Sequence, residues 1–151
     1  MNGQHKGGLS RRAFSGALLT LVAAPQAFAA LPSEVEAAIR AALGDAPVSD
    51  GGVVLRVPEL AENGAQVPVL VDVQSEIGPG RHVARVHLFA TRNPTPGIAS
   101  FTLGPASARP LVATRIRLAE GQQVLAYVVW SDDAVMRTAA EVKVSVGGCA
   151  T

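Results

Sequence analysis

Apolar and polar residues alternate with a period of two along most of the chain after residue 52, and this alternation predicts β-strands. Seven such runs are separated by short stretches rich in Gly, Pro and Asn, which are typical of turns. No helical segment alternates with these strands, so the pattern predicts an all-β fold built as a two-sheet antiparallel sandwich. The predicted strands are residues 53–57, 67–73, 82–90, 98–103, 111–118, 123–130 and 135–146.

A different period precedes the strands. Apolar residues recur there at helical spacing, which predicts one short amphipathic helix over residues 33–43. Ser33 and Glu36 stand at the two positions of a capping box, and Gly44 is a natural end for the helix. We expect the helix to cover one edge or end of the sandwich, and the alternative is a helix that faces a partner protein.

Two of the predicted strands carry a further signal. Residues 123–130 are almost entirely apolar, so both faces of that strand are expected to be covered. One face would be the domain core, and Tyr127 and Trp130 would lie either in that core or in a subunit interface on the other face. Pro68 has no backbone N–H, which places it on an edge strand or at the start of its strand.

The first 29 residues are predicted to be an export signal and not part of the fold. A basic start that contains a twin-arginine match is followed by an apolar run and by small residues suited to cleavage after residue 29. The apolar run is too short to span a bilayer, so the mature protein, residues 30–151, is expected in the periplasm without a membrane anchor. The residues expected to carry the signal are Arg11, Arg12, Phe14, Ala27 and Ala29.

Net charge argues against a nucleic-acid partner. The chain has 13 Lys and Arg against 12 Asp and Glu, and the export signal contains three of the cations and none of the acids, which leaves ten against 12. A slightly acidic chain without a basic run lacks the patch that nucleic acid requires. Arg115 and Arg117 share the polar face of one strand, where they either clamp an anionic partner or are simply solvated.

The predicted mature chain keeps two histidines, His82 and His87. They are five residues apart in one strand and therefore fall on opposite faces, and neither has a cysteine or another histidine beside it. This arrangement does not suit a metal site, and we expect both to be surface or interface residues. The sequence contains no nucleotide-binding loop, catalytic triad or paired zinc ligands, so no bound cofactor or metal is expected.

The only cysteine, Cys149, is third from the end of the chain and follows Gly147 and Gly148 directly after the last predicted strand. Two glycines make a narrow, bendable stalk, and five residues span at most roughly 16–18 Å, enough to deliver a sulfur atom into a partner's cleft. An ordinary thiol has a pKa of about 8.5, and the nearest cation in the sequence is Lys143. The thiol is therefore a poor nucleophile on its own, which predicts a carrier that other proteins load, and not an enzyme.

Two other classes of protein fit the same features. A structural or protein-interaction sandwich module would not depend on its last five residues. A periplasmic thiol-redox protein would turn over by itself and would need a Cys149 thiol with a lowered pKa.

Five segments of the chain form a recognisable combination: the export signal, Pro58–Gly64 (PELAENG), Asn93–Gly97 (NPTPG), Thr114–Ala119 (TRIRLA) and Val146–Cys149 (VGGC). Together they resemble the SoxY family, the sulfur-carrier subunits of the periplasmic thiosulfate-oxidising (Sox) system. The likeness covers nearly the whole mature chain and implies an immunoglobulin-like sandwich. In this family the near-terminal cysteine is the covalent attachment point for sulfur intermediates, and the resemblance gives that role to Cys149.

The resemblance also implies partners. It implies a heterodimer with a SoxZ-like subunit and transient contacts with three enzymes. These are a haem c enzyme that attaches thiosulfate through a disulfide-like bond, a di-manganese hydrolase that releases sulfate, and in some systems a molybdenum enzyme that oxidises the remaining sulfane sulfur. Cys149 would then hold S-thiosulfonate and persulfide-type adducts.

The predicted carrier arm, residues 147–151, departs from the family at its tip. The family usually ends in Gly-Gly-Cys-Gly-Gly, whereas Ala150 and Thr151 follow the cysteine here. Two extra side chains, one of them β-branched, thicken and stiffen the tip. This departure bears on passage through narrow partner channels and not on the identity of the attachment site.

Overall fold

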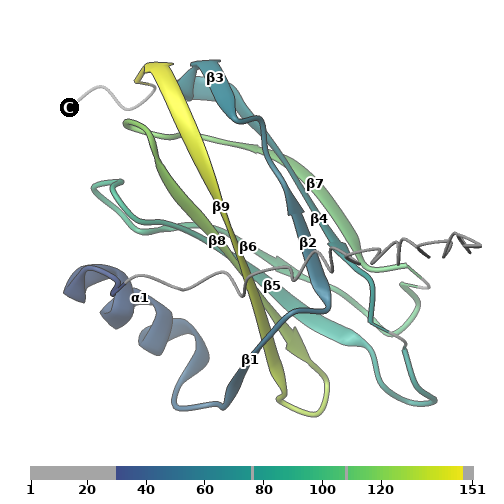
Figure 1. The fold of residues 1–151 in the computed structure, drawn as a ribbon. Coiled ribbons are helices and arrows are strands. Elements are labelled where there is room, and N and C mark those ends of the chain that lie inside the picture. The colour runs from purple at the N-terminus through teal and green to yellow at the C-terminus, as the bar shows by residue number, and fades with distance from the viewer. Residues whose placement is uncertain (1–29, 76, 108, 148–151) are drawn as a thin grey trace, which may run out of the picture.

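Two β-sheets face each other in the computed structural model, which describes residues 30–75, 77–107 and 109–147 (Figure 1). One α-helix, one 3-10 helix and nine strands lie within these residues. The elements are α1 (Ser33–Leu43), β1 (Val48–Asp50), β2 (Val53–Arg56), β3 (Leu60–Asn63), η1 (Gly64–Gln66), β4 (Val67–Val73), β5 (Val83–Ala90), β6 (Gly97–Thr102), β7 (Leu111–Ile116), β8 (Gln122–Trp130) and β9 (Val135–Val146).

The larger sheet has the strand order β1-β9-β8-β5-β6, with β3 also paired to β9, and the smaller sheet has the order β2-β4-β7. All the long ladders are antiparallel, which confirms the predicted all-β sandwich. The strand count differs from the predicted seven, because β1 and β3 lie in segments between the helix and the second predicted strand that show no strand pattern. Both are short and mostly exposed, and both pair in parallel with β9. Their sequences therefore show no alternation of buried and exposed residues.

The core between the two sheets consists mainly of valine. Trp130 and Leu118 are fully buried in it, so the face of β8 that bears Trp130 points toward the smaller sheet. Packing of this kind is non-directional and needs no crosslink. The buried members of this core include Val67, Val69, Val71, Val86, Leu88, Val124, Val128 and Val142.

A second, smaller core lies on the outer face of the larger sheet, beneath α1. Val35 of the helix is buried there against Tyr127 and Phe89, whose rings meet edge to face with centroids 5.6 Å apart. The chain's own helix thus covers the second face of β8. Tyr127 and Trp130 are both core residues and not anchors in a subunit interface.

The start of α1 differs from the prediction. The helix begins at Ser33, as expected, but Pro32 is the N-cap residue and no side chain caps the helix. The carbonyl of Pro32 accepts the amides of Val35 and Glu36 at 3.0 and 3.1 Å. The predicted capping box of Ser33 and Glu36 is therefore wrong, because Ser33 already lies inside the helix.

Pro68 lies in the central strand of the smaller sheet but near the start of that strand. The neighbouring strand β2 pairs with β4 only from Leu70 to Val73, so β4 has β7 alone as its partner at Pro68. The missing N–H of proline is tolerated there because no ladder bond to β2 is interrupted.

Candidate functional site

The last strand, β9, ends at one end of the sandwich with Val146, whose side chain is 64% exposed. Gly147 follows and is the last residue that the structure describes. The predicted attachment residue Cys149 lies outside the described residues, with Gly148, Ala150 and Thr151. The site can therefore be built only as far as the base of the predicted arm, and we call this end of the sandwich the arm end.

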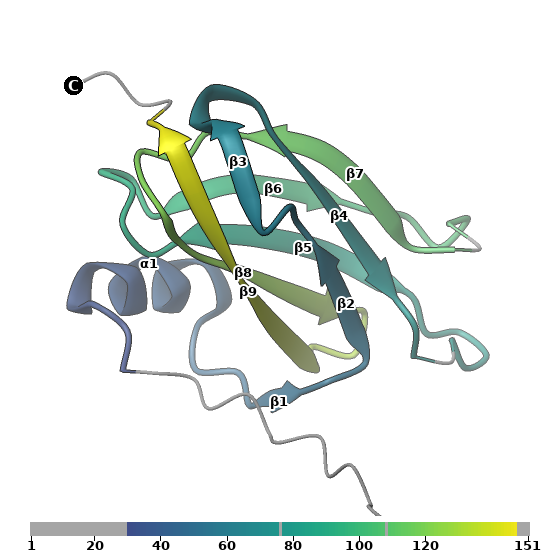
Figure 2. The ribbon, with the colours of Figure 1, turned by 45° about the horizontal axis from the view of Figure 1, so that its top comes forward.

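One side of the arm end is formed by β3, which runs beside the last residues of β9 (Figure 2). The two strands pair in parallel, with Ala61 opposite Val144 and Asn63 opposite Val146. The Asn63 side chain accepts the amide of Ala65 at 2.8 Å and caps η1. These contacts hold the final residues of β9 to the PELAENG segment.

The loop between β7 and β8 forms the other side. Its residue Leu118 donates its amide to the Gly64 carbonyl at 2.8 Å, which joins this loop to η1. The carbonyl oxygen of Ala119 lies where a side chain on Gly147 would begin, since a Cβ placed on Gly147 would overlap that oxygen. Glycine is therefore the residue type that this position accepts without movement of the backbone.

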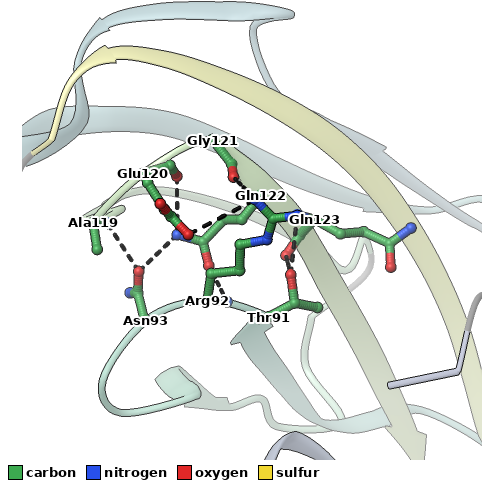
Figure 3. A network of polar contacts seen from close by, with 8 residues as sticks. All are labelled: Thr91, Arg92, Asn93, Ala119, Glu120, Gly121, Gln122 and Gln123. Carbon is green, nitrogen blue, oxygen red and sulfur yellow. Dashed lines mark hydrogen bonds and ion pairs between the residues drawn. The ribbon is translucent and has the colours of Figure 1, made fainter. Parts of the chain in front are cut away.

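Two side-chain amides hold this loop in place (Figure 3). Asn93, from the loop between β5 and β6, donates to the Arg117 carbonyl at 2.8 Å and accepts the Ala119 amide at 3.0 Å. The side chain of Gln122 donates to Asn93 Oδ1 at 2.8 Å and to the Glu120 carbonyl at 3.1 Å. Together they form the amide network of the arm end.

Gln122 is 1% exposed and its amide is fully used, because its Oε1 also accepts the Arg92 backbone amide at 2.7 Å. The Arg92 guanidinium extends the contact outward, with a hydrogen bond to the Gly121 carbonyl and an ion pair of 3.7 Å with Glu120. Both partners of that ion pair are more than half exposed. The ion pair therefore contributes little to stability compared with the hydrogen bonds of the buried amides.

Four segments that are far apart in the sequence thus meet at the arm end. They are PELAENG, NPTPG, TRIRLA and the start of VGGC, and each touches at least one of the others through a contact described above. Asn63, Asn93, Ala119 and Gly147 are the residues through which they meet. Sequence reasoning did not find Gln122, although a polar residue at the head of an apolar strand was a usable signal.

The two histidines take no part in this site. His87 lies opposite Tyr127, which lies opposite Arg137, nine residues before Val146 along β9. That is roughly 30 Å along the strand, whereas the three residues from Val146 to Cys149 span at most about 11 Å. His87 therefore cannot serve as a base for Cys149 of the same chain.

His87 instead borders an apolar groove of about 610 Å³ between α1 and the edge strand β6. Its Nδ1 lies 2.7 Å from Ser100 Oγ, and its buried Nε2 has no hydrogen-bond partner among the residues that the structure describes. Burial, and then the nearby charge of Arg85, lower the pKa of His87 below its usual value of 6.5. The neutral form of the ring is favoured there.

The remaining candidates are exposed. Arg115 and Arg117 both lie on the surface, as their strand face predicted. Within the ranges that the structure describes, no three His, Cys, Asp or Glu side chains gather as metal ligands. The helix among those residues lacks the length and apolar character needed to cross a membrane.

Comparison with known proteins identifies the family that this chain resembles. The family model described as sulfur oxidation protein SoxY matches residues 39–149, a range that includes the predicted attachment cysteine. The solved structure of the sulfur carrier protein SoxY from Chlorobium limicola f thiosulfatophilum is 32% identical, with a TM-score of 0.62 over 76% of this chain and 98% of that one. No curated protein matches the chain.

More distant structures share the fold alone. A superoxide reductase (neelaredoxin) from Ignicoccus hospitalis is 16% identical with a TM-score of 0.54, over 62% of this chain and 80% of that chain. A protein from Thermotoga maritima described as a putative superoxide reductase is 13% identical with a TM-score of 0.55, over 66% of this chain and 93% of that chain. Because the SoxY model spans most of the chain and the Chlorobium carrier is matched over nearly its whole length, this chain belongs to the SoxY family, whose members are sulfur carriers and not enzymes.

Proposed function

We propose that this protein carries sulfur intermediates of thiosulfate oxidation as covalent adducts on Cys149 and presents them to partner enzymes in the periplasm. The observation that supports this most directly is that the only cysteine of the chain falls inside the SoxY match, three residues beyond the end of β9. The geometry of the arm end supports it further. Val146 is exposed, and the backbone carbonyl of Ala119 borders Gly147 closely. The chain therefore leaves the sandwich at a defined point, two residues before Cys149 in the sequence.

Loading would form one S–S bond. The Cys149 thiolate and the sulfane sulfur of thiosulfate join, and the two electrons released pass to the haem c partner. Hydrolysis by the di-manganese partner would then add water and release sulfate and two protons, which leaves a persulfide on Cys149. A molybdenum partner, where the host has one, would oxidise the sulfane sulfur that remains.

In this scheme the chain positions the Cys149 thiol, and the partner enzymes supply the acid, base and metal groups that react with it. The arm end combines backbone carbonyls, neutral amides and the exposed Arg92–Glu120 ion pair. Lys143 is exposed four residues before Gly147, and its amide is bonded to the Glu59 carbonyl at 2.9 Å. The proposal therefore assigns activation of the thiol to groups inside a partner's cleft.

Mass spectrometry of the intact mature protein tests the adduct. After incubation with thiosulfate, the haem c partner and an electron acceptor, the mass should rise by that of one thiosulfate, and a reductant should remove the addition. Peptide mapping should place the adduct on Cys149, and Cys149→Ser should show none. An unmodified thiol after loading, or an adduct that survives in Cys149→Ser, would refute the proposal.

We further propose export by the twin-arginine route, with cleavage after Ala29, and a stable heterodimer with a SoxZ-like subunit. Replacing both arginines of the signal, Arg11→Lys with Arg12→Lys, should leave uncleaved precursor in the cytoplasm. The periplasmic fraction of the unaltered strain should contain protein that begins at Ala30 and elutes together with the second subunit. Periplasmic accumulation of the double variant at the normal level would exclude this route.

A further inference from the structure

We propose that Asn93 and Gln122 are positioning residues, which fix the point and direction in which the chain leaves the sandwich at Gly147. The proposal rests on the proposed carrier function and assigns two residues to it. The proposal assigns neither residue a contact with the sulfur. Their effect passes through the backbone of residues 117–121, against which Gly147 lies.

The first step is that Asn93 joins two loops. Its Nδ2 donates to the Arg117 carbonyl at 2.8 Å, and its Oδ1 accepts both the Ala119 amide at 3.0 Å and Gln122 Nε2 at 2.8 Å. A single planar amide therefore bonds to residues on both sides of Leu118. Figure 3 shows its bonds to Ala119 and Gln122. The segment from residue 117 to residue 119 cannot rotate without breaking at least one of these bonds.

The second step is that the buried side chain of Gln122 holds Asn93 in position through a hydrogen bond. Gln122 is 1% exposed, and its amide spans from the backbone of Arg92 to the carbonyl of Glu120. A buried amide that loses one partner leaves a desolvated polar group, so these bonds form and break together. The network is thus a rigid connection between the β5–β6 loop and the β7–β8 loop.

The third step is the contact with the base of the arm. The Ala119 carbonyl, whose own amide Asn93 holds, closes one side of Gly147. On the same loop, Gly121 approaches β9 so closely that a Cβ there would lie 3.4 Å from the Val142 carbonyl oxygen. A loop that moved at Ala119 would free or obstruct the exit of the chain.

A fixed exit of the chain would affect how the Cys149 thiol is presented to partner enzymes. Several partner enzymes must each receive the same sulfur atom in a productive geometry, and a misplacement of about 1 Å can cost up to a hundredfold in rate. Small reagents in solution have no such requirement. The network should therefore matter for transfer to and from partner enzymes and not for the intrinsic reactivity of Cys149.

The test uses Asn93→Leu and Gln122→Met, which keep the approximate size of each side chain and remove its hydrogen bonds. Val86→Ala is the control, because Val86 is 1% exposed in the main core and lies opposite Val128, six residues from Gln122 along β8. This control loses stability through packing alone. All variants are prepared as full mature chains together with the second subunit.

The first measurement is the position of the arm. A nitroxide on Cys149, the single thiol of the chain, broadens the NMR signals of nearby amides. In the unaltered protein we expect broadening to concentrate on residues 60–64 and 117–121. In both network variants the broadening should spread to other amides. In Val86→Ala the broadening pattern should match that of the unaltered protein.

The second measurement is the rate at which the haem c partner loads thiosulfate. We expect a fall of between about tenfold and a hundredfold in both network variants, with the rate of alkylation by iodoacetamide unchanged. An unaltered broadening pattern, or a loading rate equal to that of Val86→Ala, would overturn the assignment. If the unaltered protein takes up no thiosulfate, the carrier function itself fails, and the broadening pattern still decides whether the network positions the arm.

Discussion

At the scale of single residues, Gly147 gives the most direct test of the arm end. In Gly147→Ala the new methyl group would overlap the Ala119 carbonyl oxygen, so the backbone must move. Overpacking of this kind costs about 1–3 kcal/mol, and we expect the free energy of unfolding to fall by that amount. Chemical denaturation measures it.

Gly104→Ala is the matched control for that substitution. A Cβ on Gly104 meets no atom within 4 Å, so its effect should stay within about 0.5 kcal/mol. Equal stability of the two variants would mean that the Ala119 carbonyl does not restrict the exit of the chain.

His87 predicts a pH dependence of stability. Burial lowers its pKa below 6.5 in the folded protein, so the unfolded chain binds a proton more readily than the folded one. The stability from the neutral ring is complete above about pH 6.5 and declines as the pH falls through the lowered pKa. We expect the free energy of unfolding to decrease between about pH 7 and about pH 5.

The decrease should be smaller in His87→Gln than in the unaltered protein. His82→Gln is the control for the loss of a histidine from the same segment. Denaturation at a series of pH values compares the three proteins. A pH profile of His87→Gln that coincides with that of the unaltered protein would show that another group is responsible.

At the scale of elements, α1 is expected to contribute to stability through one buried side chain. Val35 is 1% exposed beneath the helix, so Val35→Ala should lower the free energy of unfolding by about 1.5–3 kcal/mol. Ala37 is exposed on the same helix, and Ala37→Ser should change it by less than about 0.5 kcal/mol. Equal effects of the two substitutions, measured by denaturation, would mean that the second core does not stabilise the sheet.

The elements that the sequence predicted are those whose pattern is local. The seven predicted strands alternate or are wholly apolar, and all seven are present with ends close to the predicted ones. By contrast, β1 and β3 form only because β9 offers them a parallel partner, which no local pattern reveals. The sequence also left open whether Tyr127 is buried in the domain core or in a subunit interface. A strand pattern shows that a face is buried but not which part of the protein, or which partner, buries it.

At the scale of the whole molecule, the sequence indicates a candidate attachment residue but not the residues that meet at the base of the predicted arm. A lone cysteine after two glycines was visible as a candidate without any structure. The meeting of Asn63, Asn93 and Ala119 around the base of the arm depends on strand order, which sequence reasoning left open. Each of these residues was inside a segment that resembled the family, yet only the fold shows that they meet.

The fold also predicts that the sandwich is independent of the thiol. One cysteine cannot form a disulfide within the chain, and the two cores consist of apolar packing. The unfolding midpoint should therefore be the same with and without a reductant, and Cys149→Ser should change the free energy of unfolding by less than about 0.5 kcal/mol. An oxidant should still give linked dimers on a non-reducing gel, absent in Cys149→Ser. A clear drop in stability for Cys149→Ser would mean that the thiol packs inside the protein, where no partner could load it.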